Sequence, residues 1–144
     1  MDISIIGAGH AGTAVAALWQ RAGHRIVAVS GREATALRAS QHLPGVPILG
    51  AAEAARLGEL VILGVPDDLI ETIARALVEA GSVAPGRWIA HLSGATPLSA
   101  LDAARDAGAR RLGVHPLQTF PDVESAIDRI PGCTVAVGRC SLAG

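Results

Sequence analysis

The stretch SIIGAGHAGTAV, residues 4–15, decides the fold of this chain of 144 residues. Three glycines, Gly7, Gly9 and Gly12, stand in G-x-G-x-x-G spacing after an apolar run and at the start of a helical pattern. One glycine permits a tight turn, the second lets the backbone approach a phosphate, and the third lets the helix pack closely on the strand. The stretch therefore predicts a strand, a turn and a helix whose first N–H groups can bind phosphate.

The rest of the chain repeats this order of a short apolar run followed by a helical pattern. Strands are expected at 2–6, 25–30, 46–49, 60–66, 87–94, 110–116 and near 133–138, and helices at 10–23, 32–42, 50–58, 67–81, about 97–107 and about 122–129. This alternation is typical of β-α-β units, and the nearly continuous apolar character of the strands favours helices on both faces of a sheet. We therefore predict an α/β fold with a doubly wound, mostly parallel sheet. Gly23, Gly58 and Gly81 are expected to end three helices in the left-handed conformation.

The composition limits what the chain can bind. Half of the residues are hydrophobic, 17% are charged and the formal net charge is -1, so residues 1–144 are expected to form one domain with one core. The balanced charge argues against nucleic acid or a membrane as partner and favours a small molecule. The start MDISIIGAGH resembles neither a secretory signal nor a membrane span, which predicts a cytoplasmic protein. Cys133 and Cys140 lack metal-ligand spacing, so we expect reduced thiols and no metal site.

The first turn is predicted to hold the pyrophosphate of a dinucleotide. Its members are Gly7, Ala8, Gly9, His10, Ala11 and Gly12, and His10 is expected to contribute only its backbone N–H. A second turn, formed by Gly64, Val65 and Pro66, should lie beneath the ribose and nicotinamide end of the same ligand, because ligands of open parallel sheets bind beyond the carboxyl ends of the strands. Asp67 and Asp68, which follow, are explained as acids at a helix N-terminus.

The end of the second apolar run indicates which dinucleotide is bound. NAD sites usually carry Asp or Glu there, whereas this chain has Ser30 and Gly31, followed by Arg32. Arg32 can bind a 2′-phosphate or stack on adenine, and Ser30 can donate to that phosphate. Charge-assisted bonds of about 1.5–3 kcal/mol would favour NADP over NAD by roughly tenfold to a hundredfold. Glu33 lies close enough to weaken this preference, and an ordinary solvated arginine is the alternative for Arg32.

Two later strands end in polar groups that can transfer a proton. The run at 87–94 delivers His91, Ser93 and Gly94 to the same edge of the sheet as the run at 110–116, which delivers His115, Pro116, Gln118 and Thr119. An imidazole with a pKa of about 6.5 suits the proton that accompanies hydride transfer, which favours His115 as the proton-handling residue. Pro116 restricts the backbone of His115 to an extended form. For His91 a substrate-side role and a buried structural role both stay open, while Gln118 and Thr119 are expected to donate to a polar substrate.

The motifs HLSGATPL, residues 91–98, and GVHPLQTFPD, residues 113–122, resemble those of a known superfamily. It includes prephenate dehydrogenase, pyrroline-5-carboxylate reductase, the β-hydroxyacid dehydrogenases and relatives of 6-phosphogluconate dehydrogenase. The pair is most similar to a set of Rossmann-like, NADP-dependent oxidoreductases whose C-terminal domain has no assigned function. In prephenate dehydrogenases a Ser and the His of a His-Pro-Met-x-Gly motif form the catalytic pair, which implies Ser93 and His115 here. Ala95 stands where those enzymes often carry Lys, and Thr119 where the motif has Gly, so prephenate is not the expected substrate.

The resemblance covers nearly the whole chain and implies a Rossmann fold with hydride transfer between NADP(H) and a small polar carbonyl, hydroxy or imine compound. Relatives carry a mostly helical C-terminal domain that forms the other wall of the substrate pocket and much of a dimer interface. We therefore expect either a fragment or a short member, and a homodimer for a full-length form. Two other functions stay open: a regulatory module that senses NADPH without chemistry, and a methyltransferase that uses S-adenosylmethionine. Such methyltransferases normally have an acid after the second strand, which VAVSGRE, residues 27–33, lacks in that place.

Overall fold

One six-stranded sheet forms the centre of the part of the chain that the structure describes, residues 1–116, 122–131 and 135–139 of a computed structural model. Its strands are β1 (Asp2–Ile6), β2 (Arg25–Ser30), β3 (Leu60–Leu63), β4 (Trp88–His91), β5 (Arg110–Pro116) and β6 (Val135–Arg139). Their order is β2-β1-β3-β4-β5-β6, in which the first five strands are parallel and β6 runs antiparallel to β5. The predicted doubly wound, mostly parallel sheet is confirmed.

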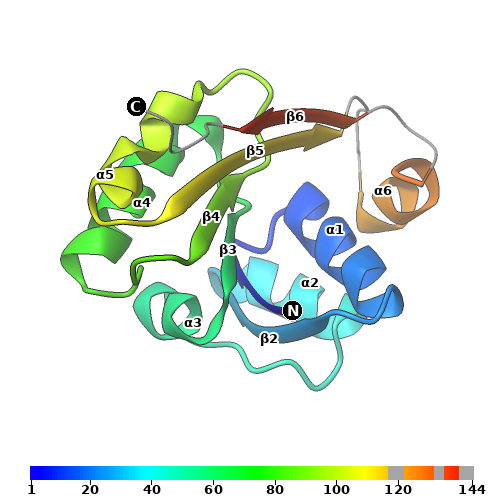
Figure 1. The fold of residues 1–144 in the computed structure, drawn as a ribbon. Helices are drawn as coiled ribbons and strands as arrows, with labels where there is room; N and C mark the ends of the chain where they lie inside the picture. The colour runs from blue at the N-terminus through cyan, green and yellow to red at the C-terminus, as the bar shows by residue number, and fades with distance from the viewer. Residues whose placement is uncertain (117–121, 132–134, 140–144) are drawn as a thin grey trace.

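Helices cover both faces of this sheet (Figure 1). One face carries α1 (His10–Arg21) and α2 (Glu33–His42), and α6 (Val123–Arg129) packs on α1. The other face carries α3 (Ala51–Leu57), α4 (Ile70–Glu79) and α5 (Asp102–Asp106). Short 3-10 helices precede α4 and α5, namely η1 (Asp67–Leu69) and η2 (Leu98–Leu101). In α4 the buried residues Ile70, Ala74 and Leu77 recur at helical spacing and face the sheet. The core is therefore divided by the sheet into two apolar layers.

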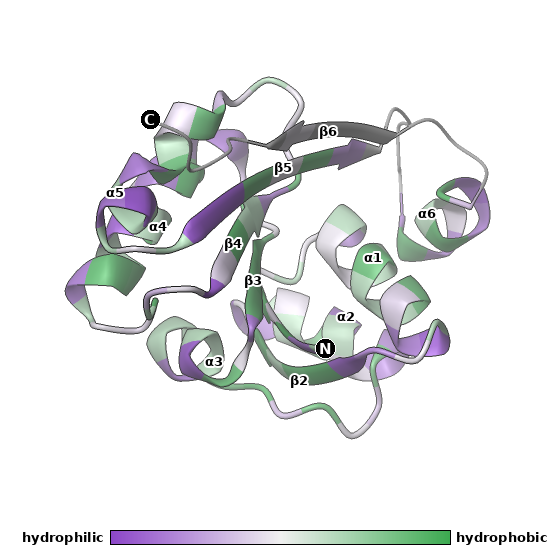
Figure 2. Ribbon diagram, in the orientation of Figure 1, coloured by the Kyte–Doolittle hydropathy of each residue, from purple (hydrophilic) through white to green (hydrophobic). Residues whose placement is uncertain are grey.

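The polarity of the strands follows their place in the sheet. The central strand β3 is hydrophobic along its length, whereas β5 is hydrophilic at both ends (Figure 2). At the start of β5 the nearly buried Arg111 pairs with Asp102 of α5 and also donates to the Leu98 carbonyl of η2 at 3.3 Å. The ion pair holds α5, and the hydrogen bond holds η2, against β5.

The segment at 46–49, predicted as a strand, is not one. It forms a single bridge, between Val29 and Ile48, with hydrogen bonds from the Val29 N–H to the Pro47 carbonyl and from the Leu49 N–H to the Val29 carbonyl. Pro47 has no N–H and so cannot donate to a ladder. The strand prediction was wrong because the apolar pattern alone does not show that Pro47 lacks the N–H group needed to extend the bridge into a ladder.

Two of the three predicted glycine caps are confirmed. Gly23 and Gly81 adopt φ values of 99° and 68° after α1 and α4, whereas Gly58 after α3 has φ −91°. Gly58 is needed for a different reason, because a Cβ atom there would lie 2.6 Å from the Ser4 hydroxyl and 2.8 Å from the Ser4 backbone N. Its lack of a side chain lets the start of β3 lie against β1.

Candidate functional site

A cavity lies where the chain reverses direction across the sheet, between the carboxyl ends of β1 and β3. The connection from β1 leads to β2 on one side, and β3 lies on the other side, which is the place where open α/β sheets bind ligands. The cavity has a volume of about 650 Å³, within the usual range for small-molecule sites. Its wall includes nine of the residues predicted to bind a cofactor: Gly7, Ala8, Gly9, Ser30, Gly31, Arg32, Gly64, Val65 and Pro66.

Two turns meet at the floor of this cavity without a side chain between them. Gly7 has φ 87°, and a Cβ atom there would lie 2.5 Å from Val65 Cγ1 and 2.9 Å from the Gly64 carbonyl oxygen. A Cβ atom on Gly64 would lie 2.6 Å from the Gly7 carbonyl oxygen. The glycines of both turns are thus required for the packing of β1–α1 against β3–η1, whatever ligand the cavity takes.

The start of α1 is built to receive an anion. Gly9 is the residue before the helix, so no side chain caps the first N–H groups, and the first turn contains no acidic residue. These unpaired donors and the positive end of the helix dipole favour a phosphate. His10, Ala11 and Gly12, predicted with the cofactor-binding residues, form that first turn but are not among the residues that line the cavity.

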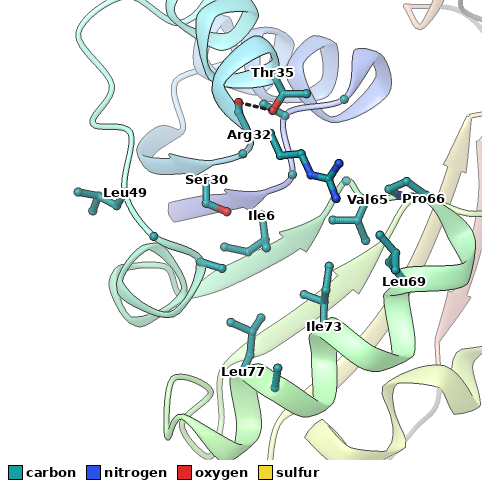
Figure 3. Close-up of a pocket in the computed structure, with 18 residues that line it drawn as sticks. Ile6, Ser30, Arg32, Thr35, Leu49, Val65, Pro66, Leu69, Ile73 and Leu77 are labelled. Carbon is teal, nitrogen blue, oxygen red and sulfur yellow. Dashed lines mark hydrogen bonds between the residues drawn. The ribbon is translucent and has the colours of Figure 1, made fainter.

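The second wall of the cavity comes from the end of β2 and the start of α2. Ser30 is buried, whereas Arg32 is exposed and extends over the cavity toward Val65 and Pro66 (Figure 3). Thr35 donates from Oγ1 to the Arg32 carbonyl at 2.8 Å, which fixes the turn into α2. Among the described residues no carboxylate forms an ion pair with Arg32. Its guanidinium group is therefore available to an anionic ligand.

Sequence reasoning missed the apolar wall of this cavity and two polar residues. Leu69, Ile73 and Leu77 line it from η1 and α4, and their four-residue spacing was a signal for one helix face. Thr35 also lines the cavity, and Arg38 donates from Nη1 to the Ala8 carbonyl at 3.3 Å, which supports the glycine turn from α2. No local pattern distinguishes these two residues, because their role depends on how α2 lies against the first turn.

A second cavity, of about 320 Å³, lies at the ends of β4 and β5. It brings together four residues predicted from two separate strands: His91, Ser93, Gly94 and His115. The remaining lining residues are Thr96, Leu98, Gly113 and Gly138. Gln118 and Thr119, the other two substrate-side candidates, lie outside the described residues, as do Cys133 and Cys140.

His115 is held by the loop that follows β4. Its Nδ1 lies 3.1 Å from the Leu92 carbonyl oxygen, and because a carbonyl only accepts, Nδ1 must carry the proton. The neutral ring therefore keeps its lone pair on Nε2, which can accept or return a proton. The Cδ2–Nε2 edge of the ring lies against Gly94, where a Cβ atom would be 2.4 Å from Cδ2 and 2.7 Å from Nε2.

Ser93 shapes the same loop with its side chain. Its Oγ accepts hydrogen bonds from the N–H of Ala95 at 3.2 Å and of Thr96 at 3.1 Å. Both lone pairs of the hydroxyl are thus engaged, and its proton is free to be donated. In the part of the chain that the structure describes, no hydrogen bond joins Ser93 to His115, so the two contribute to the cavity as separate groups.

His91 lies deeper, with 2% of its surface exposed. Its Nδ1 accepts from the Ser93 N–H at 3.2 Å, which places the proton of the neutral ring on Nε2. Within the described residues Nε2 has no hydrogen-bond partner. Burial lowers the pKa of His91, while the Pro97 carbonyl and the charge of Asp67 act in the opposite direction.

Comparisons with known proteins agree with the predicted fold. Residues 1–116 match the family model described as a Rossmann-like domain. The chain is similar in structure to an imine reductase from Streptomyces aurantiacus, with 27% identity and a TM-score of 0.66 over 83% of this chain and 42% of that one. A candidate NADP oxidoreductase from Bacteroides fragilis has 26% identity and a TM-score of 0.69 over 85% and 46% of the two chains.

A third neighbour shows the fold alone. The 3-hydroxyisobutyrate dehydrogenase of Mycobacterium tuberculosis, solved with L-serine, has a TM-score of 0.75 at 21% identity, over 95% of this chain and 46% of that one. The chain spans less than half the length of each of these three neighbours. A sequence search among curated proteins gives no match. None of the described helices is both long and apolar enough to cross a membrane.

Proposed function

Since this chain belongs to the Rossmann-like domain family, we infer that its larger cavity binds a nicotinamide dinucleotide, with NADP(H) preferred over NAD(H). The observation that carries this proposal is the start of α1, which has uncapped N–H groups and no acid in its first turn and directly follows Gly7, Ala8 and Gly9 in the wall of the cavity. The apolar wall from η1 and α4 suits an adenine ring, and the cavity has room for the adenosine half of such a ligand.

The preference for NADP(H) is argued from the end of β2. Ser30 and Arg32 line the cavity where a ribose-binding carboxylate would stand in an NAD site. Arg32 can form a two-pronged, charge-assisted bond with a 2′-phosphate, and Ser30 can donate to the same group. Glu33 is exposed beside Arg32 and reduces this preference without abolishing it.

The second cavity is proposed as the substrate side of an oxidoreductase acting on a small polar carbonyl, hydroxy or imine compound. The chemistry that NADP(H) supplies when bound is the transfer of a hydride to or from carbon. His115 keeps Nδ1 donating to the Leu92 carbonyl in both of its protonation states. As an imidazolium it can give the Nε2 proton to the substrate oxygen or nitrogen when the hydride is added to carbon, and as a neutral imidazole it can accept that proton at Nε2 in the reverse direction. The Ser93 hydroxyl can donate to the same substrate. The chain contains no lysine and no tyrosine, and among the described residues that line this cavity the imidazoles are the groups best suited to this proton transfer.

A calorimetric titration with NADPH and NADH in parallel tests the cofactor proposal. We expect NADPH to bind roughly tenfold to a hundredfold more tightly, and Arg32→Ala to reduce NADPH affinity to the NADH value. Arg21→Ala is the matched control, because Arg21 is also exposed and lies in the last turn of α1, away from the cavity. It should leave both affinities unchanged.

Three results would count against the proposal. Binding of neither dinucleotide would remove the assignment of the cavity. Equal binding of both by the unchanged chain would remove the preference for NADP(H). An equal loss in Arg21→Ala and Arg32→Ala would show a general effect of charge instead of a contact with the 2′-phosphate.

A further inference from the structure

The loop after β4, residues 92–97, connects the two histidines of the second cavity through a single peptide unit. The Ser93 N–H donates to Nδ1 of His91, and the carbonyl of Leu92, the residue before it, accepts from Nδ1 of His115. The two bonds use the two ends of one peptide unit, the one that joins Leu92 to Ser93. A rotation of that unit would break both bonds together.

From this geometry we propose that His91 is the positioning residue that fixes His115, by locking the Leu92–Ser93 peptide so that its carbonyl holds Nδ1–H of His115 and leaves Nε2 free toward the cavity. The inference rests on the proposed function in one respect, namely that His115 is taken to transfer a proton to or from the substrate. The positioning itself is a property of the chain and can be measured without cofactor or substrate.

The burial of His91 makes it suited to this task. A residue that is 2% exposed has a fixed ring, whereas His115 is only half buried and depends on its hydrogen bond for its orientation. Ser93 and Gly94 complete the arrangement, because the Ser93 hydroxyl closes the loop onto the N–H groups of Ala95 and Thr96, and Gly94 leaves space for the His115 ring. The structure thus assigns the two histidines opposite neutral tautomers, Nε2–H in His91 and Nδ1–H in His115.

Asparagine at position 91 tests whether the hydrogen bond from the Ser93 N–H fixes the Leu92–Ser93 peptide, an arrangement called the lock below. The side-chain oxygen of Asn accepts from the N–H two residues later in an Asx-turn, which is the bond that His91 makes with Ser93. Leucine fills a similar apolar space but accepts nothing. His91→Asn should therefore preserve the orientation of His115, and His91→Leu should release it.

The measurement is long-range ¹H–¹⁵N NMR of the histidine rings in the whole chain, above the pKa of either ring. We expect Nδ1 of His115 to be protonated and its Nε2 unprotonated in the unchanged chain and in His91→Asn. In His91→Leu both nitrogens should shift toward averaged values, because a released ring samples both tautomers. His24→Leu is the control, since His24 is exposed and no described hydrogen bond joins its side chain to this loop.

The inference would be overturned by a fixed His115 tautomer in His91→Leu, or by equal loss in the Asn and Leu variants. If His91→Leu fails to fold, the unchanged chain still decides: a scalar coupling across the hydrogen bond from the Ser93 nitrogen to His91 Nδ1 is expected, and its absence overturns the lock. Failure to bind NADPH in the titration would remove the proposed function and leave these spectra unaffected, so the two failures are distinguishable.

Discussion

At the scale of single residues, burial governs the acid–base behaviour of His91, one of the two histidines that line the second cavity. Burial is the largest influence on His91 and lowers its pKa from the usual 6.5. The opposing influences, from the Pro97 carbonyl and the Asp67 carboxylate, are smaller. His91 is therefore neutral in the folded chain near neutral pH and keeps the lone pair of Nδ1 that the Ser93 N–H requires.

This lowered pKa predicts a pH dependence of stability. Neutral His91 contributes stability that is fully present above its unfolded pKa of 6.5 and is lost as the pH falls through its lower folded pKa. The unfolded chain takes up the proton more readily, which shifts the equilibrium toward unfolding in acid. Urea unfolding at about pH 7.5 and about pH 5.5 should show this loss.

The comparison with His91→Leu isolates the contribution of this one ring. The variant should lose less unfolding free energy over the same pH interval, because its buried side chain has no proton to gain. His24→Leu, which removes an exposed histidine, should lose as much as the unchanged chain. A His91→Leu profile parallel to that of the unchanged chain would contradict the prediction.

Sequence reasoning found the residues of the second cavity better than it found their contacts. His91, Ser93, Gly94 and His115 were predicted because polar groups at the ends of neighbouring parallel strands converge at one edge, and the structure brings all four together. The bonds to the Leu92–Ser93 peptide could not be predicted, because they depend on the path of the loop. The buried role of His91 was one of two open alternatives, and its 2% exposure favours that role.

At the scale of secondary-structure elements, the pair between Asp102 and Arg111 joins η2 and α5 to β5 beside the second cavity. Asp102→Ala should lower the unfolding free energy by about 1–3 kcal/mol, because among the described residues it leaves the nearly buried Arg111 with the Leu98 carbonyl as its one remaining partner. This expected loss of unfolding free energy is smaller than that for a fully buried ion pair, because the Asp102 side chain is 38% exposed. Urea unfolding measures the change.

Asp106→Ala is the matched control for this prediction. Asp106 ends the same helix and pairs with Arg105, but its side chain is 68% exposed. Its removal should change stability by no more than about 0.5 kcal/mol. Equal losses of unfolding free energy in the two variants would contradict the prediction, because they would mean that the burial of Arg111 does not increase the contribution of its ion pair to stability.

Most elements were predicted from the sequence, and the failures have local causes. The β-α-β order was predicted because short, continuous apolar runs, typical of strands covered on both faces, alternate with longer stretches of helical periodicity. Residues 46–49 failed because Pro47 supplies a carbonyl to Val29 but no N–H. Gly58 was assigned to the wrong task because a glycine after a helix can serve either a left-handed turn or a close contact, and only the position of Ser4 decides.

At the scale of the whole molecule, the fold places two cavities of different chemistry on one sheet. The first has mostly apolar walls with a cation and a helix start at its rim, and the second is lined by two histidines and a serine. The carboxyl ends of β3 and β4, which are adjacent strands, connect them. A ligand with a phosphorylated adenosine at one end and a reacting carbon at the other matches this order.

Half-ligands separate the contributions of the two cavities to the stability of the molecule. Adenosine 2′,5′-bisphosphate at a hundredfold excess over its Kd should stabilise the chain by about 2.7 kcal/mol and raise the Tm by roughly 5–10 °C. The increase should largely disappear in Arg32→Ala and persist in Arg21→Ala. Nicotinamide mononucleotide at the same concentration should raise the Tm much less, because it lacks the 2′-phosphate and the adenine. Thermal unfolding measures both, and a larger effect of the nicotinamide half would contradict the assignment.

The contact between Gly7 and Gly64 limits how this sequence can evolve. A methyl group on either residue would meet the carbonyl oxygen of the other, at 2.9 Å and 2.6 Å. Because the obstacle is backbone in both directions, no replacement at one position can make room for a side chain at the other. A substitution at one of these two glycines therefore cannot be compensated by a substitution at the other. Variation in ligand preference is expected instead at positions such as Arg32, whose exposed side chain lines the cavity.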